Sequence, residues 1–148
     1  MKKSAITLFW LLSVTWGLPA TLAGAIFSLI CLGRGLKPRS FHGNVYFEHV
    51  RPRGSNNLGP FFFLGNNATP FTKYHEAGHG LQNILLGPLF FLVVGIPSEI
   101  WYQHFTRKHA RALVSGAWSE EARRAAYDAM PIERWASLWG EKMYASKE

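Results

Sequence analysis

The 148-residue chain is 48% hydrophobic and 15% aromatic, and its formal net charge is +7. This length fits one domain with a modest core, and the single cysteine, Cys31, excludes an intramolecular disulfide framework. A positive charge of this size can indicate nucleic-acid binding. Here the basic residues gather beside a long apolar N-terminal run, which favours membrane lipid as the partner and argues against nucleic acid.

Residues 5–32 form a run without any charged side chain. The run exceeds the ~18–20 residues of a spanning helix, so we predict a transmembrane anchor over residues 1–33. Gly17-Leu18-Pro19 predicts a bend in its middle. A cleaved signal peptide ending at Ala23-Gly24-Ala25 is the alternative, but residues 26–32 continue as apolar sequence, which favours a retained helix.

Basic residues flank this run on both sides: Lys2, Lys3, Arg34, Lys37 and Arg39. Most of these bases follow the run instead of preceding it. Because positive charge is enriched on the cytoplasmic side of membranes, this excess favours a cytoplasmic location for the rest of the chain.

Two stretches rich in Val, Tyr and Phe, residues 41–51 and 58–64, favour strands. The Pro-Arg-Gly-Ser-Asn-Asn cluster between them is typical of a loop, so we predict a β-hairpin. After it, Thr69 and Pro70 fit the N-cap and the first position of a helix. This central helix should end where Gly87-Pro88 follows.

Residues 84–97 are apolar but too few for a full span, and they predict a re-entrant or buried helical segment. In the tail, Ser119 and Pro131 fit the starts of two amphipathic helices, and Gly140 fits the end of the second. The apolar face of the second helix carries Ile132, Trp135 and Trp139. We expect this tail to lie on the membrane, to cover a site, or to pack as ordinary surface helices.

These elements together predict an α+β membrane protein: a transmembrane helix, a small β-hairpin, a central helix, a short apolar segment and C-terminal amphipathic helices. The expected division is an anchor over residues 1–33, a central part over residues 34–104 and a helical tail over residues 105–148.

His75, Glu76 and His79 form an H-E-x-x-H motif inside the predicted central helix. Histidines four residues apart lie on one face of a helix, so both can bind one Zn²⁺ ion while Glu76 acts on a water that the ion activates. Gln82 lies on the same stripe. Gly78 weakens a helix by ~1 kcal/mol relative to Ala. It therefore predicts that another backbone or a substrate strand passes close by, or that helices pack there.

A catalytic zinc ion needs a third protein ligand and an open position for water. Glu99 is the first candidate, because it follows His79 by 20 residues, a spacing similar to that of zincins whose third ligand is a glutamate on the next helix. Glu99 could instead pair with Arg107 or Lys108 at the membrane interface. The remaining candidates are the other histidines: His42, His49, His104 and His109.

The first functional hypothesis is a membrane-anchored zinc metallopeptidase. Glu76 would take a proton from the activated water and deliver it to the leaving amine of a peptide or protein substrate. The edge of the predicted hairpin could hold that substrate in extended form. The alternative is a non-enzymatic membrane protein, in which the His–Glu–His helix and Gln82 form a structural metal site or a packing site.

The motif and its surroundings resemble a family of small, largely uncharacterised bacterial membrane proteins. The residues that carry this resemblance are His75-Glu76-x-Gly78-His79-x-x-Gln82, the Leu-Gly-Pro-Leu-Phe-Phe-Leu stretch at 86–92 and the Gly-Ile-Pro-Ser stretch at 95–98. The family signature has an aromatic residue where Ala77 stands, and an apolar one is expected where Glu99 stands. The resemblance implies a bacterial inner-membrane location and a metal site, without a defined reaction. The short His-Glu-Ala-Gly-His string is also similar to that of membrane metalloproteases.

Overall fold

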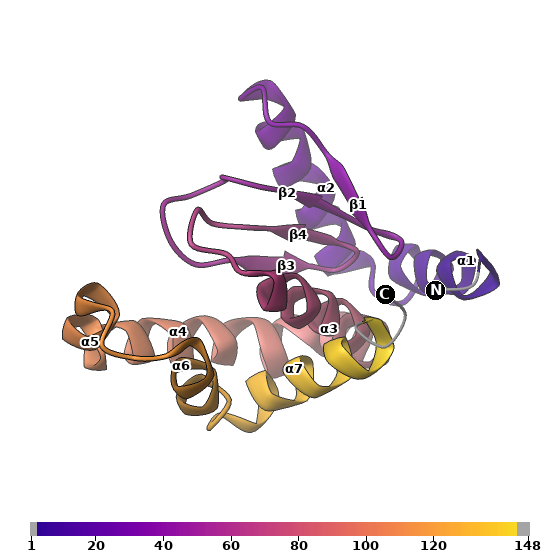
Figure 1. Ribbon diagram of the computed structural model, residues 1–148. Helices are drawn as coiled ribbons and strands as arrows, with labels where there is room; N and C mark the ends of the chain where they lie inside the picture. The colour runs from indigo at the N-terminus through magenta and orange to yellow at the C-terminus, as the bar shows by residue number, and fades with distance from the viewer. Residues whose placement is uncertain (1–2, 145–148) are drawn as a thin grey trace.

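The computed structural model describes residues 3–144, so Lys2, one of the predicted flanking bases, lies outside the described part. Within that part the chain is a mixed α+β fold with seven α-helices and a four-stranded sheet (Figure 1). The α2 helix lies on one side of the sheet, and α3 lies on the other side with α7 beneath it. The predicted fold class is thus confirmed at the level of α+β.

The apolar N-terminal run forms two helices, α1 (Lys3–Val14) and α2 (Leu18–Gly33), whose axes differ by 96°. The break lies at the predicted glycine and proline, and Thr21 Oγ1 donates a 2.7 Å hydrogen bond across it to the Ser13 carbonyl. The prediction of one spanning helix is therefore wrong, because the bend divides the run. In the described residues no single helix has the length and hydropathy to cross a membrane. Two pairs of consecutive helices reach that length and hydropathy when taken together, but each pair is sharply bent: α1 with α2, and residues 70–89 with 91–108.

The sheet contains two tight hairpins instead of the single predicted one. Its strands are β1 (Arg39–Phe41), β2 (Asn44–Phe47), β3 (Asn56–Leu58) and β4 (Phe61–Phe63), in the order β1-β2-β4-β3. The two predicted strands do pair, as β2 and β4, but in parallel. The reason is local: His42-Gly43 and Gly59-Pro60 each turn the chain within two residues, and His42, Gly43 and Gly59 all have positive φ.

Alternating side chains of β2 and β4 serve the two faces of the sheet. Tyr46 and Phe62 face α3 and stack with ring centroids 5.0 Å apart, in a core that includes Ala77 and Leu81. Phe47 and Phe63 face the opposite way, toward α2. Both layers are apolar and buried, so the sheet holds α2 and α3 in fixed positions on its two sides.

The central helix α3 (Pro70–Leu86) begins and ends where the sequence predicts. Thr72 Oγ1 accepts a 3.0 Å hydrogen bond from the Thr69 N–H at its start, and Gly87, with φ of 54°, ends it. The apolar segment then forms a 3₁₀ turn η1 (Gly87–Leu89) and a π-helical turn η2 (Phe91–Gly95). It continues directly as α4 (Ile96–Lys108).

The tail contains α5 (Ala110–Ser115), α6 (Glu120–Tyr127) and α7 (Pro131–Tyr144). Ser119 caps α6 by accepting a 3.1 Å hydrogen bond from the Ala122 N–H, as predicted. Two details of the prediction for α7 are wrong. The helix continues past Gly140. Its buried face is not the face with the tryptophans but a neighbouring stripe that consists of Glu133, Ala136, Ser137, Gly140 and Tyr144.

Candidate metal centre

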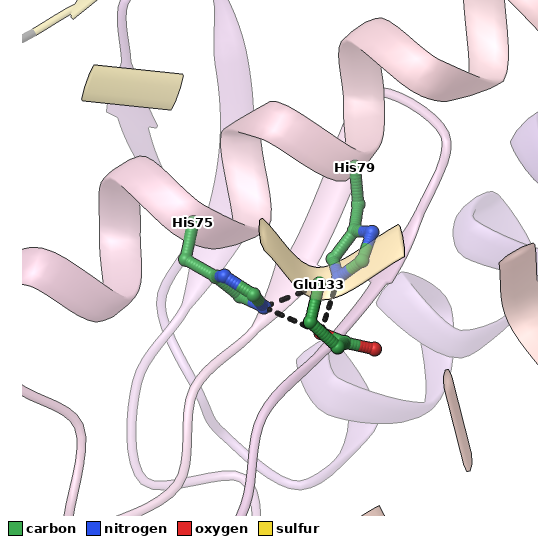
Figure 2. A group of neighbouring side chains, drawn as sticks. All are labelled: His75, His79 and Glu133. Atoms are coloured by element: carbon green, nitrogen blue, oxygen red, sulfur yellow. Dashed lines mark hydrogen bonds and ion pairs between the residues drawn. The ribbon is translucent and has the colours of Figure 1, made fainter. Parts of the chain in front are cut away.

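Two helices that are distant in sequence meet at the H-E-x-x-H motif. The α3 helix carries His75 and His79 on one side, and α7 brings Glu133 to face them (Figure 2). All three side chains are buried, and Glu133 is 0% exposed. A charged carboxylate is almost never buried to this degree without a partner, so this arrangement requires a positive charge between the helices.

Small residues allow this close meeting of α3 and α7. A Cβ atom on Gly78 would overlap the Ala136 carbonyl, and a Cβ atom on Gly140 would overlap the Tyr74 carbonyl. The backbones are therefore in contact at both glycines, which confirms that another backbone passes close to Gly78. At this separation the short Glu133 side chain reaches the two imidazoles.

The ligand atoms of the three side chains form a nearly equilateral triangle. Glu133 Oε2 lies 3.1 Å from His75 Nε2 and 3.4 Å from His79 Nε2, and the two Nε2 atoms lie 3.2 Å apart. Tetrahedral ligands at 2.0–2.1 Å from a zinc ion are separated by about 3.3 Å. The triangle therefore has the dimensions of one face of a tetrahedral metal site.

Hydrogen bonds at the other ring nitrogens set the tautomers of both histidines. Ser137 Oγ donates to Asp128 Oδ1 at 2.8 Å, so the same oxygen accepts from His75 Nδ1, 2.9 Å away. Likewise, Gln82 Oε1 accepts from His79 Nδ1 at 2.7 Å. Since both Nδ1 atoms are donors, both Nε2 atoms are free to present a lone pair toward the centre of the triangle.

The Gln82 amide is itself held in a defined orientation, because its Nε2 donates a 3.0 Å hydrogen bond to the Ile132 carbonyl on α7. This residue thus orients His79 and also ties α3 to α7. The sequence prediction placed Gln82 on the histidine stripe, and the structure gives it this supporting contact instead of a place among the three converging ligand atoms.

The electrostatics of the triad favour a cation. Burial alone would favour neutral groups, but hydrogen bonds and charge from the two histidines hold the pKa of Glu133 well below its usual range. Burial likewise disfavours a charged His79, yet the hydrogen bond and charge of Glu133 outweigh it and raise the pKa of His79 to about 9. Without a metal ion, a proton therefore takes the place of the cation, and metal binding must displace it.

A small cavity of about 70 Å³ opens beside the two histidines. Since one water occupies roughly 30 Å³, it has room for about two waters next to a metal ion. Glu76 lines this cavity, is 4% exposed, and its Oε2 has no hydrogen-bond partner. A buried carboxylate oxygen without a partner beside an open coordination position has the placement that a general base requires.

Glu99, the predicted third ligand, is exposed at the rim of this cavity and accepts a 2.8 Å hydrogen bond from Gln103. It is not among the three residues whose ligand atoms converge. The other candidate histidines also lie outside that group. His104 stacks on Trp101, His109 packs against Trp118, His42 packs near Tyr144, and His49 contacts Asn66.

Glu133 is the residue that sequence reasoning missed. It is one of several acids in a mixed-charge tail, so composition does not single it out. The usable signal is its place on a helix: Glu133 shares a stripe with Ala136, Ser137 and Gly140, at spacings of three, four and seven. A stripe of small residues allows another helix to approach closely, and a carboxylate on that stripe is buried by the approach.

The chain matches no protein-family model, no curated protein sequence and no solved structure. The resemblance to a bacterial membrane-protein family thus stays a prediction, and the geometry of the triad is the basis for assigning a function.

Proposed function

We propose that the protein is a zinc-dependent hydrolase that acts on peptide bonds, with His75, His79 and Glu133 as the metal ligands. The observation that carries the proposal is the buried triangle of ligand atoms with edges of 3.1–3.4 Å, beside a cavity lined by Glu76. Two imidazoles and one carboxylate, with a fourth position left open, are a ligand set of catalytic zinc sites.

When bound, a zinc ion would polarise a substrate carbonyl and lower the pKa of a water toward ~7. Glu76 accepts the proton from the attacking water, because its carboxylate is the one that lines the cavity with a partnerless oxygen. Glu76 then holds this proton and delivers it to the leaving amine. Ser137 and Gln82 keep the two imidazoles oriented throughout.

The metal content of the purified full-length protein tests the ligand assignment. We expect about one zinc ion per chain in the wild type and in Glu76→Gln, and loss of zinc in His79→Ala. His104→Ala is a matched control, because it removes an imidazole that lies outside the triad. Retained zinc in His79→Ala would contradict the assignment.

The same variants test the reaction with a library of internally quenched peptides. Wild type should cleave members of the library, whereas Glu76→Gln should bind zinc and show no turnover. Peptidase activity that survives in Glu76→Gln would overturn the role of Glu76 as base.

A second function, a structural metal site without catalysis, is favoured by two observations. The cavity beside the triad is only about 70 Å³, less than the volume of one amino-acid residue, and the ligands are all buried. If zinc binds stoichiometrically, if no peptide is cleaved, and if Glu76→Gln raises the thermal stability of the zinc-bound protein, the structural function replaces the catalytic one.

We also propose that α1 and α2 anchor the protein in a bacterial inner membrane, with the remainder on its cytoplasmic side. The support is that large apolar side chains of α2 are exposed, among them Ile26 at 61% and Leu29 at 68%. Arg34 and Lys37 follow directly. Flotation of the protein with lipid vesicles tests this proposal, and recovery of the protein in the lipid-free fraction would contradict it.

A further inference from the structure

Tyr127, the last residue of α6, lines the cavity together with His75 and Glu76. Its ring lies 6.0 Å from the His75 ring and 5.1 Å from the Phe105 ring, measured between centroids. Trp101 Nε1 donates a 3.0 Å hydrogen bond to the Tyr127 carbonyl, which fixes the backbone at this position. Tyr127 is therefore held against a metal ligand by contacts from α4 on one side and from α3 on the other.

The side chain of Tyr127 carries a phenolic hydroxyl, which is a hydrogen-bond donor. The same cavity wall includes Ser98, on α4. On the same wall, Asn57 Nδ2 donates a 2.9 Å hydrogen bond to the Glu76 carbonyl and so ties β3 to α3.

Hydrolysis of a peptide bond places negative charge on the carbonyl oxygen, and a donor that already points at that oxygen stabilises the charge. Glu76 cannot supply such a donor while it acts as base, because it begins the reaction without a proton. Tyr127 lines the same cavity and carries a phenolic hydroxyl. The arrangement thus supplies both groups that the chemistry requires, a base and a donor, on different helices.

We propose that Tyr127 is a catalytic residue whose hydroxyl donates a hydrogen bond to the carbonyl oxygen of the substrate. This inference rests on the proposed function and deepens it, because it requires a substrate or inhibitor with a carbonyl oxygen next to the metal ion. No bond to Tyr127 forms or breaks, and its proton stays on the phenol.

Binding of acetohydroxamate to the cobalt-loaded full-length protein tests the inference, because this small molecule presents a carbonyl oxygen to a metal ion. Tyr127→Phe should weaken acetohydroxamate binding by about tenfold or more, the effect of losing one hydrogen bond to a charged ligand. Before acetohydroxamate is added, the cobalt affinity of Tyr127→Phe should lie within twofold of that of the wild type. The visible spectrum of its bound cobalt should be unshifted. A purely structural role for Tyr127 would change these two quantities first.

Tyr46→Phe is the matched control, because it removes a phenolic hydroxyl that contacts Lys73 and not the cavity. Acetohydroxamate binding in this variant should equal that of the wild type. Equal binding in Tyr127→Phe and wild type, or no binding to the cobalt-loaded wild type, would overturn the role of Tyr127. Failure of the wild type to bind cobalt at all would instead overturn the proposed metal site.

Discussion

Most proteins bury apolar side chains and expose charged ones. The crossing of α3 with α7 and the bent pair of α1 with α2 depart from this rule in opposite ways. At the crossing, charged and polar side chains such as Glu133 and His79 are buried. In the bent pair, large apolar side chains such as Leu29 are exposed. A buried charge requires a compensating charge, and an exposed apolar face indicates an apolar partner. The buried carboxylate at the crossing thus needs a positive charge, which a metal ion or a protonated His79 provides. The exposed face of α2 needs no such charge and is open to an apolar partner.

The two regions also differ in how their positions are determined. The crossing is fixed by direct contacts, since Gly78 and Gly140 bring two backbones together and Gln82 bonds across them. Large apolar side chains on the outward face of α2 are exposed, whereas its inward face packs on the sheet through Phe27 and Cys31. The positions of the three candidate metal ligands are therefore defined by contacts within the fold, and the lipid contact is a proposal drawn from exposure.

Replacing Glu133 should have the largest effect on the metal centre. Glu133→Gln removes one of three charged or basic ligand atoms, so zinc affinity should fall by more than about 100-fold. Glu99→Gln is the control that separates the two glutamates, because Glu99 is exposed at the cavity rim. Competition with a chromophoric chelator measures both affinities. If Glu99→Gln loses more affinity than Glu133→Gln, the assignment of the third ligand is wrong.

The corresponding change in the other region is Ile26→Asp, on the exposed face of α2. A carboxylate in a bilayer costs about 3 kcal/mol on insertion scales, so partitioning into lipid vesicles should fall by about 100-fold. The free energy of unfolding should change little, because the side chain is exposed. Val114→Asp serves as the control, since Val114 is also exposed but lies on α5, far from the proposed anchor in sequence. Unchanged partitioning of Ile26→Asp would refute the anchor.

Gly78→Ala tests whether the crossing depends on backbone contact. The added methyl group would overlap the Ala136 carbonyl, so the variant should lose about 1–3 kcal/mol of unfolding free energy. Gly33→Ala is the control, because a Cβ atom at Gly33 would meet nothing within 4 Å. Urea denaturation of both variants provides the measurement. Equal stability of Gly78→Ala and wild type would show that α7 does not approach α3 this closely.

Ser137→Ala should affect the candidate metal centre less than Glu133→Gln does. The side chain of Ser137 links His75 to Asp128. Without it, His75 Nδ1 loses its hydrogen-bond partner, while His75 Nε2 can still bind a metal ion. Zinc affinity should fall by about 10–100-fold, the usual cost of losing such a supporting contact. Ser115→Ala, on α5, is the matched control. Affinity equal to that of the wild type would mean that His75 needs no orientation by Ser137.

Local sequence signals predict the local structure of this chain well. Thr69 with Pro70 and Ser119 mark helix starts, and Gly87 marks a helix end, because caps depend on a few adjacent residues. The predicted bend in the N-terminal run is found for the same reason, at Gly17 and the proline that follows. Signals of this kind place each residue of the H-E-x-x-H motif on one helix.

Features that depend on distant contacts are not predicted by local sequence. The composition of residues 41–51 and 58–64 predicts strands, but it carries no information about strand direction, and the two strands pair in parallel. Glu133 follows His79 by 54 residues, and only the packing of α7 on α3 brings them together. Sequence spacing alone therefore predicts Glu99, because the crossing of α3 and α7 that brings Glu133 to the histidines leaves no spacing signal.

X-ray absorption at the zinc edge of the purified wild-type protein shows directly whether His75, His79 and Glu133 bind a zinc ion. We expect a zinc ion bound by two imidazoles and by oxygen ligands, at 2.0–2.1 Å. In Glu133→Gln this spectrum should change or the zinc should be lost, whereas Glu99→Gln should leave it unaltered. A protein without zinc, or with a bound zinc ion whose spectrum contains no imidazole scattering, would rule out this metal site.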